Sequence, residues 1–225
     1  MSSADVNHSV ESVGYNLSWS SFPQNRDHPL FHFIHERFRL SVQSHFSMGV
    51  FFRIYMGNID PEEFLTRTWA KPRDFVRFFK CARELYSQRS KLTGSEINAI
   101  WRTYAQMSWN EIKSSASPFM NSQSIAEMEN IFRKIVPNII DKHTTYSYKT
   151  FLEVLKPIYT IARGSIAEFY SLEHFIELIY ILGIFGTMRD DASGQAIVQT
   201  YHRGNRSFHR DGRVLIHPTV LKAFG

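Results

Sequence analysis

The stretch FLTRTWAKPRDFVRFFKCA, residues 64–82, places Pro72, Arg73 and Asp74 at the start of a segment rich in phenylalanine. Proline is well tolerated at the first helical position, because its missing N–H would have no partner there. The pattern predicts a helix that begins at Pro72. Its buried face should carry Phe75, Phe78, Phe79, Ala82, Leu85 and Tyr86, and its other side Arg73, Arg77 and Lys80.

Helical patterns continue on both sides of this stretch. Start signals predict helices from Pro29 to about residue 46, from Pro61, and from a capping box at Thr93-Gly-Ser-Glu96 to about residue 115. A serine-rich segment, residues 114–123, has no charge and marks a boundary between two units. Beyond it we expect helices from Ser124 to about Val136, over about 147–161, and over about 171–182.

The C-terminal part changes period. Ala196–Tyr201 and Arg213–Ile216 alternate like strands, and a polar, turn-rich loop joins them. Three helices followed by a β-hairpin describe a winged helix. We therefore predict a mainly α fold: a loose N-terminus at 1–14, a helical bundle at 15–115, and a winged-helix domain with a small hairpin wing at 123–225.

Composition restricts the function classes. The 225-residue chain carries a net charge of +5, so an anionic partner requires that the cations be clustered. The single cysteine, Cys81, excludes an internal disulfide, lies among apolar residues, and is expected to be buried rather than reactive. The start Met-Ser-Ser-Ala-Asp lacks the features of a secretory signal, and no apolar run is long enough to span a bilayer. We expect a cytoplasmic protein with no membrane segment.

Pro72-Arg73-Asp74 has two interpretations. A guanidinium at a helix N-terminus suits a phosphate, since its bidentate fork adds to the positive end of the helix dipole. In the alternative interpretation Asp74 caps the helix and Arg73 pairs with a neighbouring carboxylate.

Here the sequence resembles a known family. Arg67-Thr-Trp-Ala-Lys-Pro-Arg-Asp-Phe-Val-Arg-Phe78 resembles the sensor-2 region in the helical lid of AAA+-type ATPases, whose arginine faces the terminal phosphate of the nucleotide. Position 70 is Ala where many such proteins carry Gly. The segments 178–186, 201–206 and 216–218 resemble the closing winged helix of a bacterial P-loop ATPase family found near phage-defence genes.

The resemblance implies a role for Arg73 but no complete ATPase. No Gly-x-x-x-x-Gly-Lys-Ser/Thr motif and no Walker B strand is present, so we expect no ATP hydrolysis and no cofactor unless a separate core supplies the ATP site. By the same resemblance, Tyr15–Trp19 would be the last strand of such a core. A P-loop ATPase subunit is then the expected partner, and the chain itself a non-enzymatic, DNA-associated regulatory module in genome maintenance or phage defence.

Two other surfaces are candidate binding sites. The wing concentrates Arg203, Arg206, Arg210 and Arg213 in a few turn-rich residues, which favours contact with DNA phosphates; a solvated loop is the alternative. The helix at 171–182 carries Glu173 and Glu177, which phosphates would repel. The competing hypothesis is therefore a protein-interaction or dimerisation module that uses this face and has no nucleic-acid role.

Metal and catalytic sites have weaker signals. His28, His32 and His35 recur at helical spacing, but no fourth ligand is near them in the sequence, so we expect no metal site. No set of catalytic residues is legible in the sequence.

Overall fold

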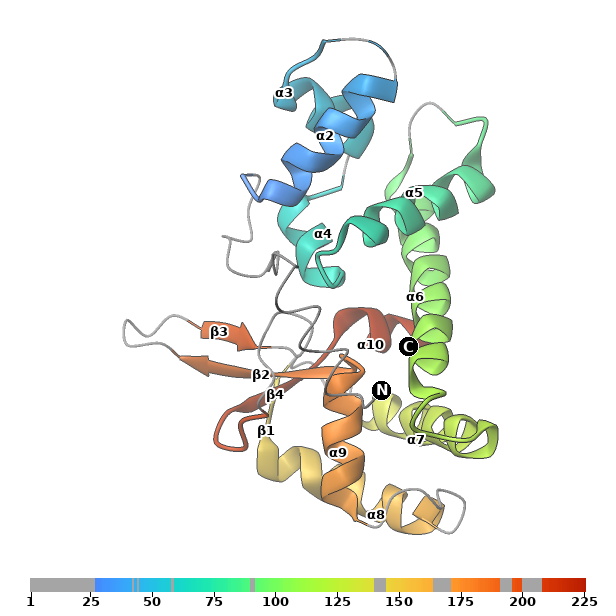
Figure 1. Ribbon diagram of the computed structural model, residues 1–225, viewed down its shortest axis with the longest axis vertical. Coiled ribbons are helices and arrows are strands. Elements are labelled where there is room, and N and C mark those ends of the chain that lie inside the picture. The colour runs from blue at the N-terminus through green and yellow to red at the C-terminus, as the bar shows by residue number, and fades with distance from the viewer. Residues whose placement is uncertain are drawn as a thin grey trace, which may run out of the picture.

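The computed structural model describes residues 27–41, 43, 45–57, 59–89, 92–139, 145–163, 171–190, 196–199 and 208–225. The loose segment predicted at 1–14 and the strand predicted at Tyr15–Trp19 lie outside these residues. In chain order the elements are α2 (Pro29–Ser41), α3 (Met48–Phe51), the π-helical turn η2 (Phe52–Met56), α4 (Pro61–Arg67), α5 (Pro72–Tyr86), α6 (Gly94–Ala116), α7 (Ser122–Ile139), β1 (Tyr146–Ser147), α8 (Tyr148–Ala162), α9 (Leu172–Ile181), β2 (Phe185–Asp190), β3 (Ala196–Gln199), β4 (Arg213–Ile216) and α10 (Pro218–Phe224). The prediction of a mainly helical chain with a small antiparallel sheet is confirmed (Figure 1).

Side-chain caps fix where several helices begin. The Asp60 carboxylate accepts from the Glu62 N–H at 3.0 Å and starts α4. Thr93 and Glu96 form the predicted capping box of α6, and the hydroxyls of Ser147 and Ser171 cap α8 and α9. Such caps satisfy N–H groups that a helix leaves without partners in its first turn.

The predicted cap of α7 is wrong by one turn. Asn121, not Ser124, caps the first turn of α7, because Asn121 Oδ1 accepts a hydrogen bond from the Ser124 N–H at 2.9 Å. Ser124 is itself inside the helix and buried.

The first apolar core lies among α2, α4, α5 and the first half of α6. Aromatic rings fill much of it: Phe64 lies 4.2 Å from Phe75, and Phe78 lies 4.5 Å from Trp101, between ring centroids. Cys81 is fully buried in this core, as predicted. Leu85, which was expected on the buried face of α5, is instead 45% exposed.

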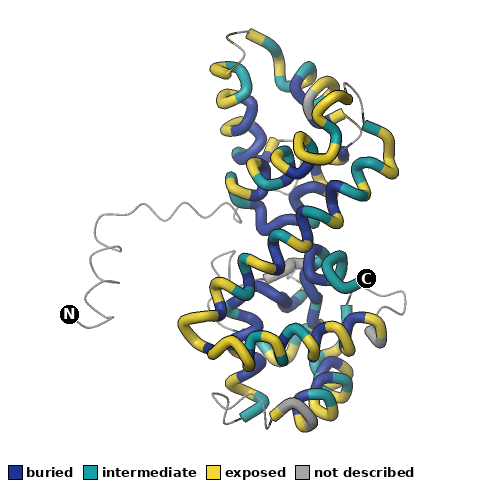
Figure 2. Tube along the Cα trace, turned by 90° about the vertical axis from the view of Figure 1, so that its right-hand side faces the viewer, coloured by how far each residue is buried: buried dark blue, intermediate teal, exposed yellow. Residues whose placement is uncertain are grey.

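Helix α6 connects this core with a second one. Its first half contributes Trp101 and Tyr104 to the first core, and its second half contributes Trp109 and Ile112 to the second. Figure 2 shows buried residues continuing from the upper part of the molecule to the lower part. One long helix therefore ties the two parts together mechanically.

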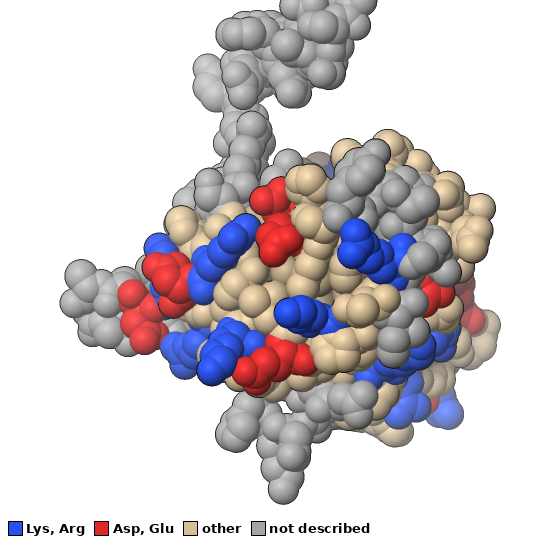
Figure 3. Space-filling model, turned by 90° about the horizontal axis from the view of Figure 1, so that it is seen from below, with Lys and Arg blue, Asp and Glu red and all other residues tan. Residues whose placement is uncertain are grey.

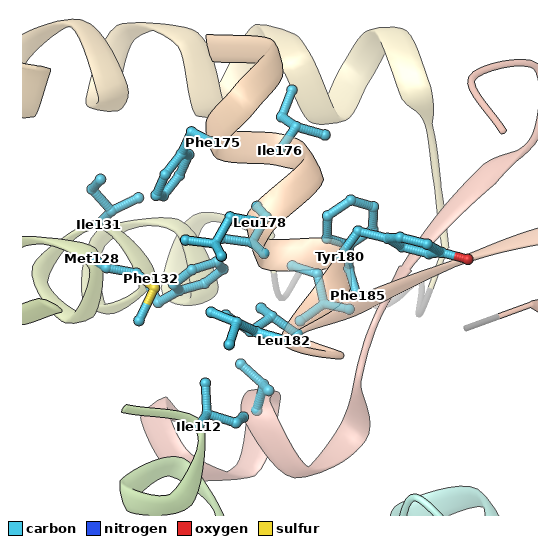
Figure 4. Packing of buried hydrophobic residues seen from close by; sticks show 14 of the residues in the cluster. Ile112, Met128, Ile131, Phe132, Phe175, Ile176, Leu178, Tyr180, Leu182 and Phe185 are labelled. Carbon is cyan, nitrogen blue, oxygen red and sulfur yellow. The ribbon is translucent and has the colours of Figure 1, made fainter. Parts of the chain in front are cut away.

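The second core lies between α7, α8, α9, α10 and the sheet. Figure 4 shows Phe175 and Leu178 of α9 on the side of Phe132 of α7, whereas Phe185 of β2 lies beside Tyr180. Leu178 of α9 and Phe132 of α7 are 5% and 1% exposed. The face of α9 that carries Leu178 is therefore buried and is not available to a ligand. Only the opposite face of α9 meets solvent.

The sheet has four strands in the order β1-β4-β2-β3, all paired antiparallel. The predicted hairpin is wrong in its pairing: β4 pairs with β2, with Phe185 opposite Ile216, whereas β3 pairs with the other edge of β2, with Asp190 opposite Ala196. One of the two inner strands, β2, is thus the segment just after Gly183, where the sequence indicated only the end of a helix. Among the described residues, no helix combines the length and the apolar character that crossing a membrane requires.

Candidate functional site

The turn that precedes α5 has a well-defined local structure. Thr68 Oγ1 accepts from the Ala70 N–H at 3.2 Å, and Ala70 adopts a left-handed conformation with φ of 52°. Glycine reaches this region without strain, whereas a β-carbon makes it costly. The Ala70 position therefore has a backbone conformation that glycine would adopt freely.

Asp74 anchors the first turn of α5 from inside. Its carboxylate accepts from the Lys71 N–H at 2.9 Å and from the Tyr104 hydroxyl at 3.1 Å, and its side chain is 1% exposed. Burial raises the pKa of Asp74, and the two hydrogen bonds partly oppose that rise. Burial also raises the pKa of Tyr104 well above its usual value, and the nearby charge of Asp74 acts in the same direction. The structure thus contains the capping role that the alternative interpretation of Pro72-Arg73-Asp74 assigns to Asp74, and also the carboxylate partner, Glu111, that it expects for Arg73.

Arg73 projects from the same turn toward α6. Its guanidinium pairs with one carboxylate oxygen of Glu111, while Arg77 pairs with the other oxygen. Arg77 also donates to Ser108 Oγ at 3.1 Å and is largely buried, at 16% exposure, whereas the Arg73 side chain is 56% exposed. Arg73 is thus the outer, solvent-facing member of this cluster.

The segment just before Ala70 contacts the C-terminal part of the chain. The rings of Trp69 and His217 stack 4.2 Å apart and within 8° of parallel, and Trp69 Nε1 donates to the Gly183 carbonyl at 3.2 Å. We call this group, residues Thr68, Trp69, Gly183, His217 and Thr219, the interlobe joint. Thr219 adds a hydrogen bond from its hydroxyl to the Arg67 carbonyl.

His217 has a defined proton arrangement in the interlobe joint. Its Nδ1 accepts from the Thr219 N–H at 3.2 Å and caps α10, so the ring proton lies on Nε2, which is 3.3 Å from the Thr68 carbonyl. Both ring nitrogens are therefore satisfied by the neutral ring. The turn before α5 is held by side chains from the opposite end of the sequence.

The structure describes two of the four predicted wing arginines, and these two differ in their ion pairing. Arg203 and Arg206 lie outside the described residues. Arg213 pairs with Asp190 at 2.9 Å, and Arg189, which the sequence analysis did not single out, pairs with Asp211. Arg210 is exposed and forms no ion pair with another described residue.

Charges of both signs occur together on the lower face of the molecule. Figure 3, the view from below, shows Lys and Arg side chains interspersed with Asp and Glu side chains. Glu173 and Glu177 are exposed on α9, and neither is ion-paired within the described part of the chain. The pKa of Glu173 is lowered by hydrogen bonds to its own N–H and to Ser171, and by the charge of Arg210.

A groove lies between α2 and α5, beside Arg73. It has a volume of about 860 Å³ and is lined by Phe33, Ile34, Arg37, Phe38, Ser41, Pro72, Arg73, Phe75, Val76, Phe79, Lys80 and Arg83. This groove was not predicted from the sequence, although both helices carry apolar residues next to arginines, which was a usable signal. Phe33 and Val76 are 42% and 67% exposed at its mouth.

The histidines of α2 do not converge. His28 and His35 are buried in the protein, His32 is exposed, and within the described ranges no cluster of His, Cys, Asp and Glu could hold a metal ion. Burial raises the pKa of Cys81, whose sulfur lies 3.4 Å from that of Met107. A raised pKa disfavours the nucleophilic thiolate.

Comparison of the chain with protein-family models, with curated proteins and with solved structures gives no match.

Proposed function

We propose that the C-terminal unit is a winged helix and that the N-terminal bundle is a nucleotide lid. The first half of this proposal rests on strand order. The chain order is α7, the short strand β1, helices α8 and α9, and then β2, β3 and β4, and β1 pairs with the edge of β4 that β2 does not occupy. In a winged helix a short strand from between the first two helices completes a hairpin, and the pairing of β1 with β4 and of β4 with β2 supports this proposal, in which β3 is an addition.

In this proposal the protein is a non-enzymatic regulatory module of a P-loop ATPase in genome maintenance or phage defence. Arg73 completes the nucleotide site of a core that another polypeptide, or another part of the same one, supplies. The observation that carries the proposal is the geometry of Ala70–Asp74. A left-handed residue, a proline and a buried aspartate together fix the first turn of α5 and leave the Arg73 guanidinium half exposed.

The pairing of Arg73 with Glu111 is compatible with this role. An exposed ion pair contributes about 0–1 kcal/mol, so a phosphate can displace it at small cost. Glu111 keeps its second partner, Arg77, when Arg73 turns away, and no buried carboxylate is left without a cation. In this proposal Glu111 binds the Arg73 guanidinium when no nucleotide phosphate is present.

The interlobe joint connects the turn that carries Arg73 with the proposed winged-helix unit, so it could couple the two. Trp69 lies four residues before Arg73 and is stacked on His217, which follows β4. A displacement of the lid turn therefore changes contacts with the winged-helix unit directly. Nucleotide state at Arg73 would be coupled to the position of the wing.

The test uses the complex that the proposal requires. The tagged protein is purified from its native cells, copurifying P-loop ATPases are identified, and the ATP turnover of the complex is measured for wild type and Arg73→Ala. Loss of an arginine that faces the terminal phosphate should lower kcat at least about tenfold without dissolving the complex. Arg102→Ala, an exposed arginine on α6, is the matched control. Equal turnover in Arg73→Ala and Arg102→Ala, or the absence of any P-loop partner, would refute the proposal.

Contact with DNA is the part of this function assigned to the wing. In the described part of the wing, Arg189 and Arg213 are each neutralised by an aspartate, so the contact depends on Arg210 together with Arg203 and Arg206. We expect duplex DNA to bind weakly, with a slope of log affinity against log salt that falls by about one for each of these three arginines replaced by alanine. Fluorescence anisotropy at several salt concentrations measures that slope, and binding that does not depend on salt would remove DNA from the account.

A second candidate is a protein-interaction module that uses α9. The exposed face of α9 carries Glu173 and Glu177, and phosphates would be repelled there. A basic protein surface or a second copy of the chain would be attracted. A complex or dimer that is lost in Glu173→Lys/Glu177→Lys but kept in Glu153→Lys, an exposed site on α8, would favour this candidate over DNA binding.

A further inference from the structure

The α2–α5 groove has the composition of a binding surface. Its floor is formed by the packed side chains Ile34, Phe38, Phe75 and Phe79, and its mouth exposes Phe33 and Val76. Exposed apolar side chains are common as single residues, but those that gather beside a concave apolar site mark a region where a partner can bury them. None of the functions argued above uses this surface apart from Arg73 at its edge.

The rim of the groove is cationic. Arg37, Arg73, Lys80 and Arg83 are among its lining residues, and none of the described lining residues is Asp or Glu. Arg73 and Lys80 have carboxylate neighbours outside the groove, Glu111 and Glu84. Arg37 and Arg83 are exposed and are not ion-paired to any other described residue, and Arg37 lies 5.8 Å from the Phe33 ring centroid. Among the described residues, the rim therefore presents a cation without a carboxylate partner on each side of the apolar floor, Arg37 on α2 and Arg83 on α5.

The length of the groove fits a short helix. Its lining on α5 runs from Pro72 to Arg83, and eleven helical steps of about 1.5 Å make a trough about 16 Å long. Three turns of a helix fit in this length, so apolar anchors at positions i, i+4 and i+7 can all reach the floor. Acidic residues beside the anchors would then face Arg37 on α2 and Arg83 on α5.

Single-stranded nucleic acid fits the groove less well. Such strands bind by stacking their bases on exposed aromatic faces. Here Phe75 is 1% exposed, and of the two apolar side chains at the mouth Phe33 is 42% exposed, whereas the more exposed one, Val76 at 67%, has no ring. The floor favours the insertion of apolar side chains over the stacking of bases.

We propose that the α2–α5 groove is a docking site for an acidic amphipathic helix of a partner protein, with apolar side chains seated between Phe33 and Val76 and carboxylates on Arg37 and Arg83. This site does not depend on the role proposed for Arg73. Charge complementarity of this kind raises the association rate and makes binding sensitive to salt, while the apolar anchors supply most of the affinity.

The test selects ligands without assuming the identity of the partner. A phage-displayed library of randomised peptides is selected on the full protein and then counter-selected on Val76→Glu, a change at an exposed position that should leave the fold intact. The peptides recovered are synthesised and titrated by fluorescence anisotropy. Enrichment of sequences with apolar residues at helical spacing flanked by Asp and Glu is the expected result.

Matched variants locate the binding surface. Val76→Glu and the Arg37→Glu/Arg83→Glu pair should each weaken the selected peptide at least about tenfold. Leu85→Glu places the same charge on α5 at a residue that is 45% exposed but does not line the groove, and it should bind like wild type. Circular dichroism confirms that the variants are folded.

Four results would overturn the proposal. The first is a selection that enriches basic or non-helical peptides, or no peptide at all, and the second is an affinity for the selected peptide that is unchanged in Val76→Glu. The third is a self-association of the protein that Val76→Glu abolishes. The fourth is a single-stranded oligonucleotide or an anionic lipid that binds in the groove and displaces the peptide. The third result would assign the groove to a second copy of this chain, and the fourth to an anion of another class. Because the Arg73→Ala turnover assay does not involve this peptide, failure of the groove proposal leaves the nucleotide proposal standing, and the reverse is also true.

Discussion

Replacement of His217 by alanine tests whether the interlobe joint holds the two parts of the molecule together. The change removes the cap on the Thr219 N–H, worth about 1 kcal/mol, and the buried hydrogen bond to the Thr68 carbonyl, worth about another 1 kcal/mol. It also removes a ring stack with Trp69 that contributes about 0.5–1.5 kcal/mol beyond its buried area. The free energy of unfolding should therefore fall by about 3 kcal/mol in total.

Urea denaturation followed by far-ultraviolet circular dichroism measures this loss. For a slope of about 2–3 kcal/mol per molar urea, His217→Ala should lower the unfolding midpoint by about 1 M. His217→Asn keeps a good cap but not the ring, so it should recover about 1 kcal/mol. His174→Ala, at an exposed histidine on α9, should change the stability by less than about 0.5 kcal/mol. If His217→Ala behaved like His174→Ala, the joint would not be a structural contact and the reasoning would be refuted.

Three further changes test other parts of the structure. Ala70→Gly should stabilise the protein by about 0.5–1 kcal/mol, because the strain of the left-handed Ala70 exceeds the entropy that glycine adds to the unfolded chain; a lower urea midpoint would contradict the left-handed turn. Gly212→Ala should destabilise the sheet by about 1–3 kcal/mol, since its β-carbon would lie 2.8 Å from the Met188 carbonyl oxygen, and unchanged thermal unfolding would disprove the close approach. Burial raises the pKa of Tyr180 to about 12, from 10.0 when it is unfolded, so its contribution to stability is complete below pH 10 and is lost as the pH rises toward 12. Tyr180→Phe should therefore flatten the fall in stability over that range, and an identical pH profile in the two proteins would refute the assignment.

Local signals predicted most of the helices. Asp60, Thr93, Ser147 and Ser171 each provide a side-chain oxygen that caps the first turn, and the structure confirms all four helix starts. Such interactions occur within three residues of sequence, so they can be recognised without knowledge of the fold. Helix α10 was missed because it is short and its cap is a histidine, His217.

The sheet could not be predicted in the same way. Strand β2 is defined by its partners β3 and β4, which lie on either side of it, and the alternation in Ala196–Gln199 and Arg213–Ile216 does not say which strand pairs with which. Pairing is decided by the packing of Phe185 and Ile216 against the second core, which depends on residues far away in the sequence. The boundary predicted between residues 115 and 123 stays a prediction.

The sequence predicted Arg73 and Asp74 as residues of the candidate site, but it did not predict the side chains that contact them. Arg73 and Asp74 were recognised because proline and acidic residues mark helix starts. Their partners Glu111 and Tyr104 come from the next helix, α6, and Tyr104 is 30 residues from Asp74 along the chain, so no local pattern connects them to α5. The wing prediction depended on clustering alone, and the pairing of Arg213 with Asp190 across the sheet was not visible in that clustering.

Photocrosslinking with an ATP analogue that carries its reactive group on the γ-phosphate tests the central claim most directly. The purified complex with the copurifying P-loop ATPase is irradiated, and the labelled peptides of this chain are mapped by mass spectrometry. The account predicts label on the segment from Arg67 to Arg77, and a strong decrease of that label in Arg73→Ala. Label confined to the ATPase, or found on this chain only outside that segment, would contradict the claim that Arg73 faces the nucleotide.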